Sequence, residues 1–151
     1  MKLAHALMER KAIKTKMDEL RARIYQNAQV EQGGEPTESP ITLLDQLEVE
    51  SQRFQALVAR INDTNLSARL PDGTPLGEAV LRKDMLRYLH ATLLCLAKKA
   101  VVVPERYSQR EIKNIPALPI PEVHHRADEV AKQLRLLDAA VQELNWQIDL
   151  R

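Results

Sequence analysis

Glu122 and His125 are the two side chains whose spacing is most typical of a metal site, because they form a Glu-x-x-His pair. On a helix this spacing places a carboxylate and an imidazole on one face, as in the di-iron sites of helical bundles. Those sites require two such pairs and two further carboxylates, and only one pair is found here. An acidic residue in a first helical turn also has a simpler role, because it interacts favourably with the helix dipole. We therefore expect no metal or other cofactor in a single chain, and a metal enzyme would need a second pair from another copy.

The other polar residues match no catalytic or nucleotide-binding motif. No serine or cysteine stands in a nucleophile-elbow sequence, and the four glycines lack the spacing of phosphate-binding loops. The single cysteine, Cys95, lies in the segment LLCLAKK, where a cysteine is most often a small buried hydrophobe. The sequence therefore predicts a protein that is not an enzyme.

Basic residues gather in two places. Around the connection that precedes the last helix, the cations and one aromatic residue are Lys98, Lys99, Arg106, Tyr107, Arg110 and Lys113. Such a group could form a surface for phosphate, single-stranded RNA or a protein partner. Glu105 and Glu111 among them favour a solvated loop with ordinary charges instead. The second group lies in the first helix and consists of Lys11, Lys14, Arg21 and Arg23. The net charge is only +1, so the composition does not predict a dedicated nucleic-acid-binding protein.

The composition favours an all-α fold. Apolar residues make up 44% of the 151 residues and aromatic residues only 3%, so the core must be aliphatic. A chain of this length buries about 70% of the surface that its unfolded form exposes, which fits a single domain over residues 1–151. No apolar run is long enough for a membrane span or a secretion signal. We therefore expect a cytoplasmic protein.

Apolar residues recur at alternating steps of three and four along four segments, a spacing that predicts amphipathic helices. The predicted stripe of the first segment is Leu3, Ala6, Arg10, Ile13, Met17, Leu20, Ile24 and Asn27. That of the second is Leu44, Leu47, Ser51, Phe54, Val58, Ile61 and Asn65, widened by Leu43 and Leu57. That of the third is Ala79, Leu86, Leu89, Leu93, Leu96 and Ala100, and that of the fourth is Val123, Ala127, Val130, Leu134, Leu137, Val141, Leu144 and Ile148. The predicted helices cover about residues 2–30, 40–65, 75–100 and 122–149, and a long connection covers 101–121. Ser39-Pro40 and Thr74-Pro75 have residue types typical of helix starts, and Asp72-Gly73 is typical of a tight turn. We predict an elongated antiparallel four-helix bundle, or paired coiled-coil hairpins, with the third helix the most enclosed. Four apolar residues are expected to pin the long connection to the bundle: Ile112, Ile115, Leu118 and Ile120.

Arg10 interrupts the apolar stripe of the first helix. An unpaired buried guanidinium is costly, so a cation in this position indicates a buried pair or a device that sets helix register. Counted from the helix starts, its height matches polar residues of the next two helices. We therefore predict a structural polar layer near the chain termini, formed by Arg10, Asn62, Asn65 and Asp84. The antiparallel arrangement also places the turn after the second helix beside both termini, where Trp146 would cover the core.

Six motifs together resemble the septicolysin-like family of small bacterial helical proteins of unknown function. In chain order they are LAHALMERK, LRAR, INDTN, RLPDGTPLGEAVLRKD, RYSQREIK and NWQIDL. The resemblance implies a helical fold and a bacterial source, and it supplies no catalytic residues. The family label implies a cytolysin, but thiol-activated pore formers surround their cysteine with tryptophans. Here the only tryptophan lies fifty residues from Cys95.

Two functions fit these features best. The first is a non-enzymatic helical protein that self-associates or docks to a protein partner, because long amphipathic hairpins offer surfaces to partner helices. The second is a nucleic-acid or ribosome-associated adaptor that uses the cations of the first helix and of residues 98–113. Neither the partner nor the oligomeric state follows from the sequence.

Overall fold

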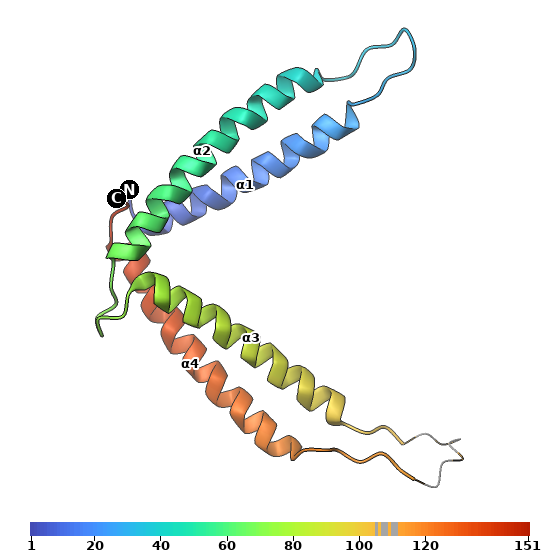
Figure 1. Cartoon of the computed structure of the whole chain (residues 1–151), viewed down its shortest axis with the longest axis vertical. Helices are drawn as coiled ribbons and strands as arrows, with labels where there is room; N and C mark the ends of the chain where they lie inside the picture. Colours follow the sequence, from blue (N-terminus) through green and yellow to red (C-terminus); the bar gives the residue numbers. More distant parts are fainter. Residues whose placement is uncertain (105, 107–108, 110–111) are drawn as a thin grey trace. The chain divides into compact units, whose positions relative to one another are not determined.

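The computed structural model describes residues 1–104, 106, 109 and 112–151. These residues form four helices and no strand, which confirms the predicted all-α class (Figure 1). The helices are α1 (Leu3–Gln26), α2 (Pro40–Ser67), α3 (Leu76–Ala100) and α4 (Ile120–Gln147). The first helix therefore ends four residues before the predicted boundary, and the other boundaries lie within two residues of the predicted ones. None of the helices in the described part of the chain is long and apolar enough to cross a membrane.

The chain divides into two compact units. One unit consists of residues 1–69 and 142–151, and the other consists of residues 70–141. The first therefore contains α1, α2 and the last turns of α4, while the second contains α3 and most of α4. A single domain over the whole chain stays a prediction.

In the first unit α1 and α2 run side by side as an antiparallel hairpin. The buried positions of α1 include Leu3, Ala6, Ile13 and Leu20, in agreement with the predicted stripe. In α2 the buried stripe passes through Glu50, Leu57, Ile61 and Thr64. It was predicted to pass through Ser51 and Asn65, so two of its positions are shifted by one residue. The sequence favoured Ser51 and Asn65 because they continue the spacing from Leu44, but Leu44 is 40% exposed and the neighbouring Leu43 is buried.

Glu50 is accommodated in the hairpin because two cations lie beside it. The ammonium of Lys16 on α1 donates a hydrogen bond to its Oε1, and the guanidinium of Arg53 is 3.8 Å from its Oε2. The Glu50 side chain is 9% exposed, whereas Lys16 and Arg53 remain largely in solvent. A carboxylate is tolerated in such a position only because it is paired.

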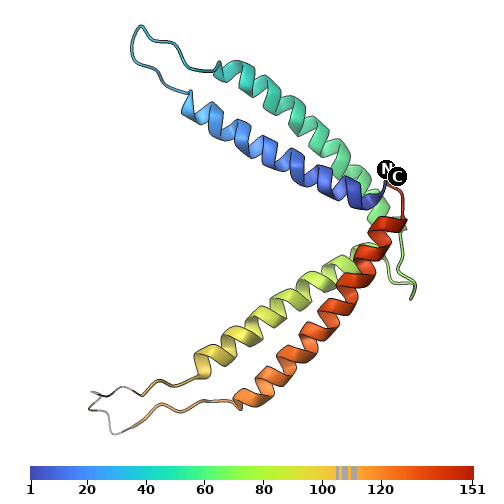
Figure 2. The same ribbon diagram turned by 180° about the vertical axis from the view of Figure 1, so that it is seen from behind.

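The first unit also brings the two ends of the chain together (Figure 2). The backbone N–H of Leu3 donates to the carbonyl of Ile148 over 3.0 Å, and the N–H of Leu150 donates to Met1 over 2.8 Å. At the end of α2, the Thr64 hydroxyl accepts a hydrogen bond from the N–H of Arg151 over 3.0 Å. The end of α2 therefore lies beside both termini, as the antiparallel arrangement predicts. Trp146 is 48% exposed and meets His5 edge to face at 5.2 Å, so it covers the core only in part.

In the second unit α3 and α4 pack closely as a hairpin. The buried positions of α4 in this unit are Val123, Ala127, Val130 and Val141, which confirms its predicted stripe. The inward positions of α3 follow a regular alternation of three and four residues: Leu76, Ala79, Lys83, Leu86, His90, Leu93, Ala97 and Ala100. Two polar residues, Lys83 and His90, therefore occupy positions on this stripe.

Lys83 pairs with Asp138 of α4. Its ammonium donates a hydrogen bond to the Asp138 carboxylate over 2.9 Å, and its side chain is only 11% exposed. The carboxylate keeps contact with water at 39% exposure, and Arg87 lies 3.8 Å from it. The stem of Lys83 thus packs in the hairpin while its charge is neutralised at the hairpin's edge.

Substitution of Lys83 by methionine is expected to leave stability nearly unchanged. Methionine keeps the packed stem, and Asp138 retains water and Arg87, so the free energy of unfolding in urea should change by less than about 1 kcal/mol. Asp138→Ala should cost about 2 kcal/mol, because it leaves the enclosed ammonium without this acceptor. Equal losses in the two variants would contradict this description of the pair.

The turn between α2 and α3 forms as the sequence predicts, apart from its helix cap. Gly73 adopts a positive φ of 87°, which side chains disfavour, and its N–H donates to the carbonyl of Leu70 over 2.9 Å. The Asp72 carboxylate accepts the N–H of Thr74 over 2.9 Å, and this hydrogen bond lowers the pKa of Asp72. The N-cap residue of α3 is Pro75, and no side chain forms a capping hydrogen bond there. The prediction that Thr74 caps this helix is therefore wrong. The Ser39 cap of α2 is confirmed, because its hydroxyl accepts the N–H of Thr42.

Three predictions about the second unit are wrong. The long connection is not pinned by its isoleucines, because Ile112 and Ile115 are 87% and 79% exposed. The third helix is not the most enclosed, since much of its apolar surface is in solvent. Cys95 is exposed rather than buried. The two isoleucines are exposed because they lie in the connection beyond the end of α3 and before the start of α4. The other two errors have one cause: α3 has apolar residues on two faces, and α4 covers only one of them.

Candidate interaction surfaces

The outer face of α3 is an apolar stripe that no described element of its unit covers, apart from its last residue, Leu96, which also lines the groove at the hairpin tip. It consists of Leu81, Met85, Tyr88, Leu89 and Leu96, which are 60%, 55%, 73%, 45% and 40% exposed. Leu81, Tyr88 and Cys95 are spaced by seven residues, so they lie in one line along the helix. The apolar residues on the outer face of α3 thus have the regular spacing that is typical of a surface that packs against another helix. We call these five residues the α3 outer stripe.

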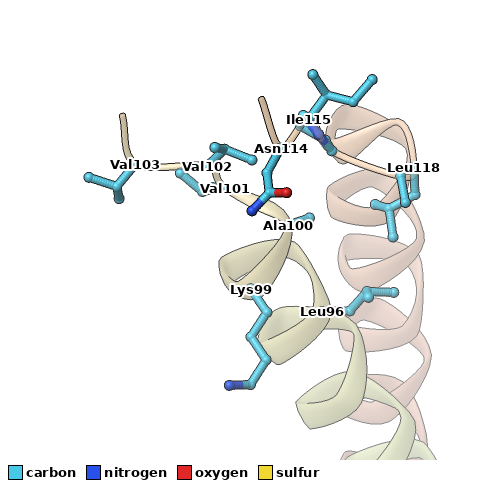
Figure 3. Close-up of a pocket in the computed structure, with 11 residues that line it drawn as sticks. Leu96, Lys99, Ala100, Val101, Val102, Val103, Asn114, Ile115 and Leu118 are labelled. Carbon is cyan, nitrogen blue, oxygen red and sulfur yellow. The ribbon is translucent and has the colours of Figure 1, made fainter. Parts of the chain in front are cut away.

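A second surface lies at the tip of the α3–α4 hairpin. There the chain leaves α3 through Val101, Val102 and Val103 and returns to α4 through Ile115 and Leu118. These two arms enclose an open groove of about 480 Å³, with Leu96 at its base (Figure 3). Figure 3 places Asn114 between the arms, beside Ala100. The groove is therefore mainly apolar.

The basic residues of the predicted phosphate or partner surface lie at this same tip. Lys98, Lys99, Arg106 and Lys113 are exposed there. Tyr107 and Arg110, which belong to the same prediction, lie outside the described residues. A role of this group in binding stays a prediction.

The cations of α1 are mostly paired with acidic residues. Lys14 and Arg21 both contact the Asp18 carboxylate, at 3.0 and 3.1 Å. Arg23 makes two hydrogen bonds to the Glu38 carboxylate, and these lower the pKa of Glu38 and raise that of the guanidinium. Three of the four predicted cations therefore already have anionic partners within the unit. This weakens α1 as a phosphate-binding face.

A smaller groove of about 360 Å³ lies along the first half of α1. Its lining residues are Leu7, Arg10, Lys11, Lys14, Thr15 and Phe54. All of them except Phe54 come from α1. Lys14 is paired with Asp18, so Arg10 and Lys11, with the apolar Leu7 and Phe54 beside them, are the cations of this groove that offer a surface to an anionic partner.

The residues of the predicted polar layer are not buried. Arg10, Asn62 and Asp84 are exposed and Asn65 is half-buried. Asp84 pairs with Arg87 one turn along the same helix, at 3.2 Å. Arg10 is therefore solvated and does not need a buried partner, and a role for the four residues in helix pairing stays a prediction. The buried polar residues near the chain ends are instead Thr64 and Asn145.

The candidate metal ligands lie at the start of α4. Glu122 and His125 are both exposed, and Glu122 pairs with Arg126 at 2.6 Å. Within the part of the chain that the structure describes, no three histidine, cysteine, aspartate or glutamate residues are grouped as metal ligands would be. Arg126 therefore provides the local partner of the Glu122 carboxylate.

The α3 outer stripe is the surface that the sequence-based interpretation missed. Its signal was present, since apolar residues of the third helix outnumber the positions of one stripe. The spacing of three and four predicts one wide apolar face that includes Leu89 and Leu96, whereas both are exposed in the structure. The seven-residue spacing of Leu81, Tyr88 and Cys95 is the signal in the sequence that indicates this second face.

Comparison with known proteins assigns the chain to a family. A family described as a family of unknown function, DUF6847, matches residues 10–150. The chain belongs to this family. A crystal structure described as a functionally unknown conserved protein from Corynebacterium diphtheriae is similar, with 34% sequence identity and a TM-score of 0.91. The match covers 100% of this chain and 99% of that one.

Neither comparison supports the septicolysin-like label, because neither description mentions it or a lytic activity. None of the curated proteins compared matches the chain. The family and the similar crystal structure therefore agree on a conserved protein whose function is not known.

Proposed function

We propose that this chain is a non-enzymatic helical module that self-associates through the α3 outer stripe. The observation that supports the proposal is a second apolar line on a helix whose first apolar line is already packed against α4. Contiguous apolar patches on a folded protein typically mark interaction sites, whereas single exposed apolar residues need no explanation. The stripe extends over sixteen residues from Leu81 to Leu96, or about 24 Å of helix.

A second copy of the chain is the partner that we propose. An isologous contact places the same patch of both copies against each other, so one apolar stripe on a helix is sufficient to form it. We propose that the protein acts in the cytoplasm and that it does not lyse cells. Lysis of red cells by the purified protein would overturn that last part.

Cys95 offers a direct test, because it is the only cysteine and lies in line with Leu81 and Tyr88. We expect the rate of Cys95 modification by a soluble thiol reagent to fall about fivefold or more between dilute and concentrated protein, since association covers the stripe. Unfolded protein at the same concentrations provides the control for reagent depletion. An unchanged rate per cysteine, together with a monomeric mass at both concentrations, would reject self-association through this face.

The groove on α1 supports a second function, that of an adaptor for an anionic partner such as RNA. Arg10 and Lys11 are exposed beside Phe54 in this groove. Phosphate contacts weaken steeply as salt rises, so retention on single-stranded RNA should fall at least tenfold from about 50 to 200 mM salt. Absence of retention at low salt would exclude this function.

A further inference from the structure

The tip of the α3–α4 hairpin combines the most exposed aliphatic side chains of the protein with cations. Among the described residues, the three large hydrophobic side chains with the highest exposed fractions are Ile112 at 87%, Ile115 at 79% and Val103 at 78%. All three lie in the connection between α3 and α4. Single exposed apolar side chains are common on folded proteins, but a group of them in one place is typical of a site that contacts a protein or a membrane.

Positive charge is concentrated in the same stretch of the sequence. Residues 98–113 contain five of the 22 lysines and arginines and two of the 21 aspartates and glutamates. This segment therefore has a formal charge of +3 and the rest of the chain has −2, although the whole chain is nearly neutral. Lys98 and Lys99 also end α3, where they interact favourably with the helix dipole, and both are exposed.

We propose that the hairpin tip docks on the surface of a membrane that contains anionic lipids. Cations attract such a surface within about a Debye length, and aliphatic side chains beside them enter the boundary between headgroups and acyl chains. The side chains of Val103, Ile112 and Ile115 are largely exposed, so a broad apolar interface could contact all three. The binding is peripheral, because the described helices include none that crosses a membrane.

The side chains at the tip favour lipid over RNA. Single-stranded nucleic acid is bound by cations together with aromatic rings on which bases stack. Residues 98–115 contain one aromatic residue, Tyr107, against five exposed aliphatic residues: Val101, Val102, Val103, Ile112 and Ile115. Aliphatic side chains give no stacking surface for bases, whereas they contribute directly to insertion into lipid.

The test uses the full chain and sedimented vesicles of phosphatidylcholine, either alone or with about 30% phosphatidylglycerol. We expect the protein to sediment with the anionic vesicles and to remain in solution with the neutral ones. Lys98→Glu with Lys99→Glu should weaken binding about tenfold or more, since each cation near such a surface contributes to attraction. Val103→Ser with Ile115→Ser should also weaken it about tenfold, although this variant keeps every charge.

A matched control removes equally exposed aliphatic side chains elsewhere. Ile41→Ser with Leu66→Ser changes residues that are 67% and 75% exposed on α2, and it should bind vesicles like the wild type. The proposal is overturned if the wild type does not sediment with anionic vesicles, or if Val103→Ser with Ile115→Ser binds as tightly as the wild type. Binding to single-stranded RNA that the lysine variant loses and the serine variant keeps, without vesicle binding, would overturn it in favour of a nucleic-acid surface.

Discussion

Replacement of Leu81 and Tyr88 by glutamate is expected to keep the protein a monomer at concentrations where the wild type associates. Both side chains lie in one line on the outer face of α3, and they are 60% and 73% exposed. Truncation of a hot-spot residue in an interface costs about 2 kcal/mol or more, so if both residues are hot spots, the two changes should weaken association by about a thousandfold. Facing glutamates from two copies would add charge repulsion.

The matched control for this variant is Ile41→Glu with Val49→Glu. These residues are exposed to a similar extent, 67% and 64%, but they lie on α2. The sedimentation coefficients of the two variants would be compared over the same concentration range, and circular dichroism would confirm equal helix content. If the α2 variant dissociates the protein and the α3 variant does not, the association surface has been placed on the wrong helix.

Substitution of Ile61 by alanine is expected to lower the free energy of unfolding by about 3 kcal/mol. Ile61 is 1% exposed on the face of α2 that packs against α1, so the change removes buried apolar surface and leaves a cavity. Leu66 lies five residues along the same helix and is 75% exposed. Leu66→Ala should therefore change stability by less than about 0.5 kcal/mol.

Urea denaturation followed by circular dichroism measures both effects. The comparison tests which face of α2 is buried, because both residues are aliphatic and lie on the same helix, but one is buried and the other is exposed. Similar losses for Ile61→Ala and Leu66→Ala would contradict the register of the α1–α2 hairpin.

The sequence predicted the helices well because their signals are local. The alternation of apolar residues, the Ser39 cap and the Gly73 turn each depend on a few neighbouring residues, and all three appear in the structure. The stripe of α4 was predicted correctly because all of its positions are apolar. In these segments local preference and tertiary packing agree, so the sequence is sufficient.

The sequence did not predict which faces would remain exposed, because that depends on partners far along the chain. Glu50 and Lys83 occupy buried stripes only because Lys16 and Asp138 reach them across the hairpins. Arg10 occupies a stripe position by spacing and is nevertheless exposed. The α3 outer stripe was interpreted as extra width of one face, since an apolar residue has the same spacing whether its partner lies in the chain or outside it.

Sedimentation equilibrium of the wild-type protein tests self-association most directly. If the α3 outer stripe binds a second copy, the average mass should rise with concentration from that of the 17.2 kDa chain toward that of a dimer. The Leu81→Glu, Tyr88→Glu variant should stay at the monomer mass over the same range. A wild-type mass that remains at 17.2 kDa up to about 200 µM would contradict the proposal, because specific interfaces of standard size bind more tightly than that.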